Sequence, residues 1–251
     1  MLAAHSTAAA TPPSDLLRDA SLFLDFDGTL VEIAQTPDAV RVDRRLTEVV
    51  QRLHERLDGR LAVISGRPAA QVHDLLVADV VVVGSHGMEF VRKNVTREPM
   101  PRPSALAEVL VAMRKLAKHH VGLIVEDKPL GVALHYRQCP TAEIECVRLA
   151  TELASRYELH LQPGKMMVEV RAAGGDKGTA IRTLMREPDM AGTRPVFMGD
   201  DLTDEPGFAA AAELGGAGIL VGEPRKTAAR YRLEGVEAAL AWLEAASAKA
   251  A

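Results

Sequence analysis

The chain has 251 residues, 47% of them hydrophobic, which is enough for one large α/β domain or for a core domain with a smaller insert. Its net charge is -4 and its acidic and basic residues are mixed, so it lacks the basic stripe that a phosphate backbone requires and we expect no nucleic-acid partner. Only Cys139 and Cys146 are present, too few for a disulfide scaffold and without metal-ligand spacing, which favours free thiols in a reducing compartment.

Residues 1–14 lack both a charged leader and a long apolar core, so we expect a disordered tail rather than a signal peptide. No apolar stretch approaches the roughly 20 residues of a membrane helix. The run Val80–Val83 is only as long as a strand. We therefore expect a soluble, cytoplasmic monomer with no membrane partner.

Strand-like apolar runs alternate with helical patterns in the first third of the chain and again near its end. The apolar runs lie at 22–24, 61–64, 80–83, 195–198 and 219–221. Helical spacing of apolar residues is found at 44–57, at 69–76 and from 236 into the Ala-rich C-terminus. This alternation predicts an α/β fold with a doubly wound, mainly parallel sheet.

The middle of the chain has a different pattern, which begins after a proline-rich hinge at 99–103. Two repeats of a helix followed by a hairpin are predicted, with helices at 104–119 and 141–157 and strands at 122–125, 131–136, 158–162 and 167–171. Lys128-Pro129-Leu130 is interpreted as the turn of the first hairpin. We therefore predict an inserted α+β cap (lid) domain at 102–173 and a core domain formed by 1–101 and 174–251.

The segment Asp25-Phe26-Asp27-Gly28-Thr29 places two carboxylates and a hydroxyl at the end of the first predicted strand. The carboxyl ends of parallel strands open into the crevice where α/β sheets bind ligands. Residues two apart in a strand share a face, so Asp25 and Asp27 can point to one locus, where a cation such as Mg²⁺ relieves their repulsion. An Asp-Gly pair after an apolar run is also an ordinary turn signal, so this motif alone leaves a plain turn open.

Two further motifs place a hydroxyl or a cation next to a predicted helix start. Ser65-Gly66-Arg67-Pro68 follows a predicted strand, and the Ser65 hydroxyl could bind a phosphate oxygen or merely cap the next helix. Arg67 suits a phosphate or a sugar hydroxyl, although it could be a solvated charge. Lys177 precedes the helical run 180–185 and could neutralise a phosphoryl group, although exposed lysines in loops are common.

The segment Gly199–Glu205 carries four acidic residues within six positions, directly after a predicted strand. Such a concentration is costly unless a cation balances it. Asp200 or Asp201 is therefore expected to complete a metal site. A solvated acidic turn is the alternative.

In this order, the Asp-x-Asp-Gly-Thr, Ser, Lys and Gly-Asp-Asp motifs resemble those of the haloacid dehalogenase superfamily of phosphatases, whose core would be a hydrolase domain. The resemblance implies that Asp25 is the nucleophile that forms an aspartyl-phosphate. It implies that Asp27 protonates the leaving oxygen and later activates water, and that Thr29 belongs to the same catalytic motif.

The resemblance also implies a Mg²⁺ site and a phosphate site. The metal would be held by Asp25, the main-chain carbonyl of Asp27, and Asp200, with more distant or water-mediated contacts from Asp201 and Asp204. The phosphoryl oxygens would be held by Ser65 and Lys177.

Other segments are similar to those of the trehalose-6-phosphate phosphatase family. They are Gly84-Ser85-His86-Gly87-Met88-Glu89, Leu134-His135-Tyr136-Arg137, Pro163-Gly164-Lys165 with Val168-Glu169-Val170-Arg171, and Gly199 to Glu205. The resemblance implies Mg²⁺-dependent hydrolysis of trehalose 6-phosphate by a stand-alone phosphatase whose cap closes over the site. The residues implied to bind this sugar phosphate are Gly28, Gly66, Arg67, His86, Gly87, Glu89, Lys165 and Glu169. Because only 4% of the residues are aromatic, we expect the sugar to be recognised through hydrogen bonds.

Three other functions are weighed against this one. A sucrose-phosphate or mannosyl-phosphoglycerate phosphatase would share the core and differ in the cap. A signalling receiver also uses Asp, Mg²⁺, Thr and Lys, but it carries its phosphorylated Asp after a later strand and has no such insert. An inactive sugar-phosphate sensor is disfavoured because Asp25, Asp27, Lys177 and Asp200 are all present.

Overall fold

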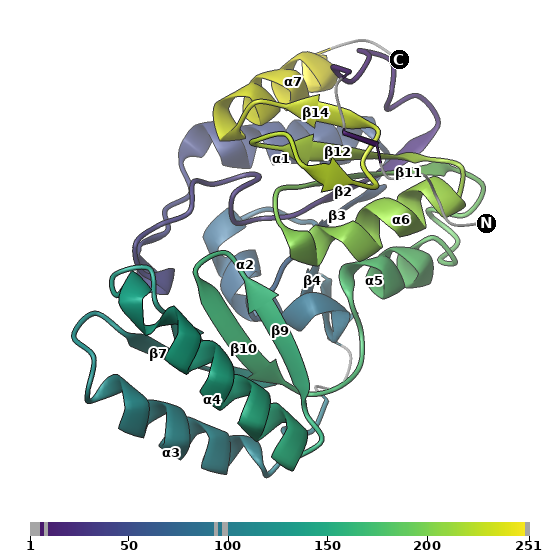
Figure 1. Ribbon diagram of the computed structural model, residues 1–251. Coiled ribbons are helices and arrows are strands. Elements are labelled where there is room, and N and C mark those ends of the chain that lie inside the picture. The colour runs from purple at the N-terminus through teal and green to yellow at the C-terminus, as the bar shows by residue number, and fades with distance from the viewer. Residues whose placement is uncertain (1–5, 8–9, 93–94, 97–99, 249–251) are drawn as a thin grey trace. The chain divides into compact units, whose positions relative to one another are not determined.

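The computed structural model describes residues 6–7, 10–92, 95–96 and 100–248 (Figure 1). The chain divides into two compact units. The core unit comprises Met1–Ile33, Arg41–Arg97 and Gly175–Ala251, and the inserted unit comprises Ala34–Val40 and Glu98–Gly174. Residues 34–40, which we had placed in the core domain, thus belong to the inserted unit.

The core unit is built on an eight-stranded sheet with the order β14-β12-β11-β2-β3-β4-β5-β6. Its parallel strands are β2 (Ala20–Leu24), β3 (Leu61–Ile64), β4 (Val81–Gly84), β11 (Arg194–Gly199), β12 (Ala217–Val221) and β14 (Tyr231–Leu233). Strands β2, β3, β4 and β12 are buried at every position, which explains why they read as continuous apolar runs. The antiparallel edge formed by β5 (Glu89–Arg92) and β6 (Val95–Thr96) was not predicted.

Helices cover both faces of this sheet, which confirms the predicted doubly wound, mainly parallel fold. Helix α1 (Arg44–Arg56) packs beside α7 (Val236–Ala248), and α5 (Lys177–Leu184) packs beside α6 (Glu205–Glu213). Figure 1 shows these two pairs on opposite sides of the strands. Phe23 of β2 and Phe197 of β11 pack in the same cluster as Phe208 of α6. The residues next to each phenylalanine along its strand face the opposite side of the sheet. Helix α2 (Ala69–Leu76) packs against β4 and β5.

The inserted unit is a four-stranded antiparallel sheet with two helices, α3 (Leu106–Ala117) and α4 (Glu143–Arg156). The strand order is β7-β8-β10-β9, with β7 at Ile124–Lys128, β8 at Gly131–His135, β9 at His160–Gly164 and β10 at Met167–Arg171. Val132, Leu134, Val168 and Val170 pack with the apolar residues of α3 and α4, so the helices cover one face of this sheet. Lys128, which we had interpreted as a turn residue, is the last residue of β7, because the turn consists of Pro129 and Leu130 alone.

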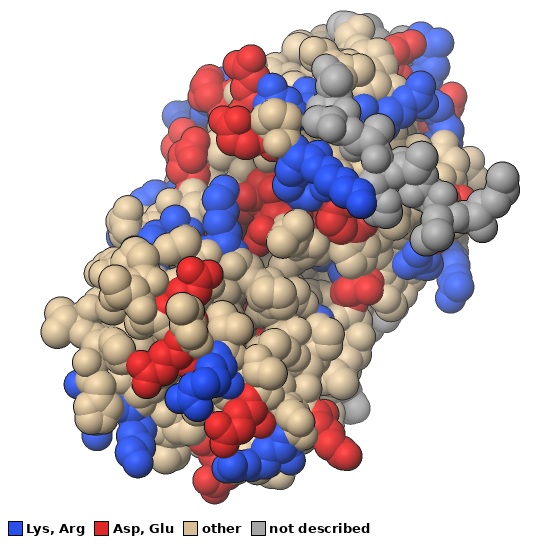
Figure 2. Space-filling view, viewed as in Figure 1, with Lys and Arg blue, Asp and Glu red and all other residues tan. Residues whose placement is uncertain are grey.

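The predicted disordered tail at residues 1–14 is only partly described. Residues 1–5 and 8–9 lie outside the described residues, whereas Ser6–Thr7 forms β1, which pairs with β13 (Lys226–Thr227). Cys139 and Cys146 are free thiols, as expected. Within the described ranges, no helix has the length and apolarity needed to cross a bilayer. On the face shown in Figure 2, acidic and basic side chains are interspersed.

Candidate active site

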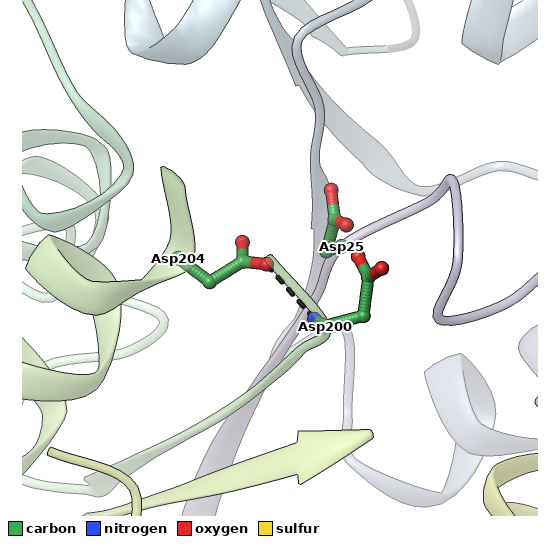
Figure 3. A group of neighbouring side chains, drawn as sticks. All are labelled: Asp25, Asp200 and Asp204. Carbon is green, nitrogen blue, oxygen red and sulfur yellow. Dashed lines mark hydrogen bonds between the residues drawn. The ribbon is translucent and has the colours of Figure 1, made fainter. Parts of the chain in front are cut away.

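Three carboxylates from two neighbouring strand ends meet in the core unit. Asp25 follows β2, Asp200 follows the adjacent strand β11, and Asp204 ends η4 (Leu202–Asp204) (Figure 3). One oxygen of each carboxylate lies within 4.8 Å of the others. The amide of Asp25 donates to the Met198 carbonyl at 2.9 Å, so the pairing of the two strands continues into the site. The parallel register therefore brings together residues that are far apart in the sequence.

Lys177 joins two of these carboxylates. It is the first residue of α5, whose N-terminus is capped by Asp176. Its Nζ lies 2.6 Å from Asp25 Oδ1 and 2.5 Å from Asp204 Oδ1, and its side chain is only 3% exposed. A single buried ammonium thus balances part of the negative charge of the site.

Asp204 lies closer to the centre of the site than we had predicted, since we had expected it to be a distant or water-mediated ligand. It is completely buried, and its Oδ2 accepts the backbone N–H groups of Asp200 at 2.9 Å and Asp201 at 2.8 Å. The carboxylate of Asp201 instead caps η4, where its Oδ1 accepts the N–H of Leu202 at 2.7 Å. The acidic segment is therefore an ordered capping box rather than a solvated turn, and Asp204 fixes the loop that carries Asp200.

Burial and neighbouring charges shift the pKa values of Asp25 and Lys177. Desolvation raises the pKa of Asp25 well above its ordinary value, and the negative charges of Asp204 and Asp200 add to that effect, while Lys177 opposes it. Desolvation acts to lower the pKa of Lys177, but Asp204 and Asp25 outweigh it and raise that pKa above its ordinary value. A nucleophilic Asp25 therefore requires further positive charge nearby to stay ionised.

The donor set fits a divalent cation. Carboxylate oxygens are hard ligands of the kind that Mg²⁺ and Ca²⁺ bind, and three of them converge here. Gly28 leaves room for one of these carboxylates, since a Cβ at this position would lie 2.2 Å from Asp200 Oδ2. Gly28 also has a φ of +82°, in the left-handed region that favours glycine. Glycine at this position thus keeps the carboxylate of Asp200 unobstructed.

Gly28→Ala is expected to weaken divalent-cation binding by about tenfold or more, the usual effect of disturbing the surroundings of metal ligands. Titration calorimetry with Mg²⁺ or Mn²⁺ measures the affinity directly. Gly192→Ala is the matched control, because Gly192 has a φ of +80° with no atom within 4 Å of an added Cβ. It therefore introduces similar backbone strain without the collision. Wild-type cation affinity in Gly28→Ala would contradict the assignment.

The carboxylate of Asp27 is bound by an arginine. Its carboxylate makes a two-pronged ion pair with Arg67, with distances of 2.7 Å from Nε to Oδ2 and 2.9 Å from Nη2 to Oδ1. The Arg67 guanidinium also lies 5.9 Å above the ring of Phe26. Arg67, which we had predicted to bind substrate, thus holds the carboxylate of the residue predicted to act as acid and base.

Two hydroxyls of the predicted site are buried, that of Ser65, predicted to bind phosphate, and that of Thr29, predicted to belong to the catalytic motif. The Oγ of Ser65 accepts the N–H of Arg67 at 3.1 Å, so its own proton can still be donated. The Oγ1 of Thr29 is enclosed, and no described residue hydrogen-bonds it. An enclosed hydroxyl without a partner costs about 1–3 kcal/mol, a cost of the kind that functional sites carry.

The Ser85–His86 turn is strained. Ser85 and His86 have φ values of 47° and 57°, although neither is glycine. Such backbone costs about 1–3 kcal/mol per residue and persists only where the surroundings hold it. Here the N–H of Ser85 donates to the Arg67 carbonyl at 2.8 Å and that of His86 to the Ser65 carbonyl at 3.0 Å. The turn thus fastens the predicted substrate residue His86 to the loop that carries Ser65.

The other predicted substrate residues of this region, Gly66, Gly87 and Glu89, have different neighbours. A Cβ at Gly66 would lie 2.6 Å from the ring of His86, and Gly87 lies against the Asp176 carbonyl. Glu89 accepts the N–H of Ala69 at 2.8 Å and so holds the first residue of α2. This contact gives Glu89 a structural role in the core unit. We had predicted only that Glu89 binds the sugar.

Lys165 and Glu169, the predicted sugar-binding residues of the insert, lie on the β9–β10 hairpin. Arg137 donates to the Lys165 carbonyl at 3.1 Å, and Met166 next to it has a φ of +61°. Glu169 is 2% exposed, and its Oε2 lies 2.7 Å from Lys128 Nζ. Both residues therefore have hydrogen-bond partners within the inserted unit.

Two charged residues of this sheet were missed by our sequence analysis. Glu126 and Lys128 lie on β7, and Glu126 Oε2 is 2.8 Å from His135 Nε2 on the neighbouring strand. Their spacing of two residues places them on one face of a strand, a signal that the sequence already contained. It was overlooked because the predicted strand ended at Val125.

The Glu126–His135 contact predicts a stability change at low pH. Burial acts to raise the pKa of Glu126, but the hydrogen bond from His135 and the charge of Lys128 outweigh it and place that pKa below 4.5. A lowered pKa stabilises the fold fully above pH 4.5, and this contribution is lost as the pH falls through the folded-state pKa.

His135→Gln is expected to flatten that loss of unfolding free energy, as measured by urea denaturation at a series of pH values below 4.5. His119→Gln, at an exposed position of the same unit, is the control and is expected to follow the wild type. An identical pH slope in His135→Gln and wild type would refute the coupling.

Known proteins resemble this chain over most of its length. The family model described as trehalose-phosphatase matches residues 23–237. Trehalose-6-phosphate phosphatase of Escherichia coli (strain K12) is 38% identical over 225 residues, which cover 88% of this chain and 84% of that protein. A Sinorhizobium fredii (strain NBRC 101917 / NGR234) protein named "Probable trehalose-phosphate phosphatase" is 36% identical over 213 residues, which cover 81% of this chain and 78% of that protein.

The fold has a close counterpart among solved structures. The C-terminal domain of C. albicans trehalose-6-phosphate phosphatase aligns with a TM-score of 0.84, covering 97% of this chain and 99% of that one. The sequence identity over this alignment is 21%, so the likeness concerns the fold.

Proposed function

The chain belongs to the trehalose-phosphatase family, and from this premise we propose that it hydrolyses trehalose 6-phosphate to trehalose and phosphate. The observation that carries the proposal is that Asp25, Asp200 and Asp204 converge beside the carboxyl ends of two parallel strands, with Lys177 in contact with Asp25 and Asp204. That arrangement combines a buried nucleophile with a cation and a set of metal ligands, as transfer of a phosphoryl group requires.

The chemistry proceeds in two displacements. A carboxylate oxygen of Asp25 attacks phosphorus, the ester P–O bond breaks, and the sugar oxygen leaves with a proton supplied by Asp27. Asp27, now a carboxylate, takes a proton from a water molecule, whose oxygen attacks phosphorus, releases phosphate and restores Asp25. Arg67 contacts the carboxyl group of Asp27 and so fixes its position.

Electrostatic support comes from the other residues of the core unit. Lys177 and the hydroxyls of Ser65 and Thr29 are the groups that would neutralise or hydrogen-bond the phosphoryl oxygens. Asp25, the main-chain carbonyl of Asp27, and Asp200 would hold Mg²⁺, with Asp204 in contact with the same group of ligands. Bound there, the cation would neutralise carboxylate charge and favour the ionised form of Asp25.

The residues that we assign to sugar recognition differ from those that carry out the phosphoryl chemistry. We assign Lys165 and Glu169 of the inserted unit, with His86 of the core unit, to the sugar hydroxyls. A carboxylate accepts and an ammonium donates, so the two insert residues together suit the mixed hydrogen bonding of a polyol. The inserted unit is proposed to be the cap that selects the leaving group.

The test is Mg²⁺-dependent phosphate release from trehalose 6-phosphate, glucose 6-phosphate and sucrose 6-phosphate under the same conditions. The expected result is the highest kcat/KM for trehalose 6-phosphate and loss of activity with a chelator that Mg²⁺ restores. Preference for either competitor would overturn the substrate while leaving the phosphatase chemistry in place.

A further inference from the structure

The loops that follow β11 and β12 leave the core sheet side by side. The two strands are parallel neighbours, with Gly199 paired with Leu220, so both loops emerge at the same edge of the sheet. The first loop carries Asp200, and the second, at residues 222–225, carries Arg225 just before β13. The side chain of Arg225 is therefore within reach of the backbone beside a proposed metal ligand.

Arg225 bridges the two loops. Its Nη2 donates to the Asp201 carbonyl at 2.7 Å, and its Nη1 donates to Glu205 Oε1. The second oxygen of Glu205, which is the first residue of α6, accepts the N–H of Ala228 at 2.8 Å. The side chains of Arg225 and Glu205 are 23% and 25% exposed, so most of each is shielded from water. The start of α6 thus anchors the arginine that contacts Asp201.

The backbone at Asp201 is held from two sides. Asp204 Oδ2 accepts the N–H groups of Asp200 and Asp201, and Figure 3 shows the first of these bonds. The Asp201 carbonyl accepts the Asp204 N–H at 3.1 Å as well as the guanidinium of Arg225. The N–H and the carbonyl of Asp201 belong to the two peptide planes on either side of its Cα, so both planes are fixed. Without Arg225, no side chain among these contacts would hold the second plane.

This bridge opposes the repulsion within the site. The carboxylates of Asp25, Asp200 and Asp204 converge and repel one another until a cation binds. A loop that could move would relieve the repulsion by withdrawing Asp200, and cation binding would then have to restore its position at a cost in affinity. The charge of Arg225 is offset by that of Glu205, so the bridge adds little positive potential that would repel the cation.

We propose that Arg225 is a positioning residue for the metal site, which together with Glu205 holds the Asp200 loop in the conformation that binds Mg²⁺. It rests on the proposed function, in which Asp200 is a ligand of that cation. Arg225 acts through the backbone of Asp201 and takes no part in the phosphoryl step. A partly exposed ion pair by itself contributes little to folding stability, so the main effect of losing Arg225 is expected on cation affinity.

Arg225→Met is expected to weaken Mg²⁺ binding by about 10- to 100-fold, the usual effect of removing a group that orients a metal ligand. Titration calorimetry of the cation-free protein measures this affinity. The Mg²⁺ concentration for half-maximal phosphate release from trehalose 6-phosphate is expected to rise by a similar factor, whereas kcat and KM at saturating Mg²⁺ change much less. Arg186→Met, at an exposed position of the same unit, is the matched control and is expected to bind Mg²⁺ like the wild type.

Glu205→Gln and the double variant Arg225→Met/Glu205→Gln test whether the two residues act as one unit. Glutamine keeps an oxygen for the Ala228 N–H but lacks the charge that anchors the guanidinium, so a smaller loss of Mg²⁺ affinity is expected. Arg225→Met is expected to weaken binding less in the Glu205→Gln background than in the wild type. Urea denaturation without a cation shows whether each variant is folded. If Arg225→Met is not, wild-type Mg²⁺ affinity in Glu205→Gln overturns the proposal.

Three results would contradict the role of Arg225. The first is wild-type Mg²⁺ affinity in a folded Arg225→Met, and the second is an equal loss of affinity in Arg186→Met. The third is a fall in kcat that saturating Mg²⁺ does not restore, without a change in Mg²⁺ affinity, which would show a general structural role. A wild type that binds no Mg²⁺ in calorimetry would instead refute the metal site of the proposed function, and the role of Arg225 with it.

Discussion

Replacing Asp25 by asparagine is expected to lower kcat for phosphate release by about 10⁴-fold or more, the scale found when a catalytic nucleophile is removed. Asparagine keeps the shape of the side chain but cannot form an acyl-phosphate as a carboxylate does. The measurement is steady-state phosphate release with saturating Mg²⁺ and trehalose 6-phosphate. Asp74→Asn is the matched control, because the Asp74 side chain is 85% exposed on α2, and it is expected to keep wild-type activity.

Trapping the intermediate makes this prediction sharper. The wild type, quenched in acid during turnover, is expected to carry one phosphoryl group on the peptide that contains Asp25, as read by mass spectrometry. Asp25→Asn is expected to carry none. Label on another peptide, or substantial turnover by Asp25→Asn, would show that Asp25 is not the nucleophile.

Lys177→Met is expected to abolish activity and to lower the free energy of unfolding by about 3–5 kcal/mol when no divalent cation is present. The substitution removes the ammonium that lies 2.6 Å from Asp25 and 2.5 Å from Asp204, and both carboxylates are buried. Protonation of Asp25, whose pKa burial already raises, offsets part of the cost at low pH. The destabilisation is therefore expected to grow as the pH rises.

Urea denaturation of wild type and Lys177→Met, with and without Mg²⁺, measures this effect. Added Mg²⁺ is expected to return part of the lost stability through binding to the folded state, but not the activity. Lys115→Met is the control for replacing an exposed lysine by methionine. A destabilisation no larger than that of the control would mean that the two carboxylates do not depend on Lys177.

Much of the fold could be predicted because its main signals are local. Buried parallel strands read as short apolar runs, and the predicted strands 61–64 and 167–171 coincide with β3 and β10. The missed elements had weaker local signals. Strand β5 is half-buried rather than apolar throughout, and α6 begins within the acidic segment that we had interpreted only for its chemistry.

The sequence likewise predicted part of the candidate site and missed another part. The four motifs, through the superfamily that they resemble, predicted that Asp25, Ser65, Lys177 and Asp200 carry the chemistry, and the structure brings Asp25, Asp200 and Lys177 together. The sequence could not show that Asp204 would be the buried partner of Lys177 while Asp201 caps a turn. Both are aspartates in one short segment, and only the path of η4 distinguishes them.

By itself, then, the sequence determined which residue types stand at the ends of which strands, since alternation, apolar runs and turn residues act over a few positions. The tertiary structure alone decided which charges meet: Lys177 with Asp25, Arg67 with Asp27, and Lys128 with Glu169. These partners are separated by 152, 40 and 41 residues. Such contacts depend on strand order and register, which come from packing across a whole sheet, and no local pattern in the chain encodes them.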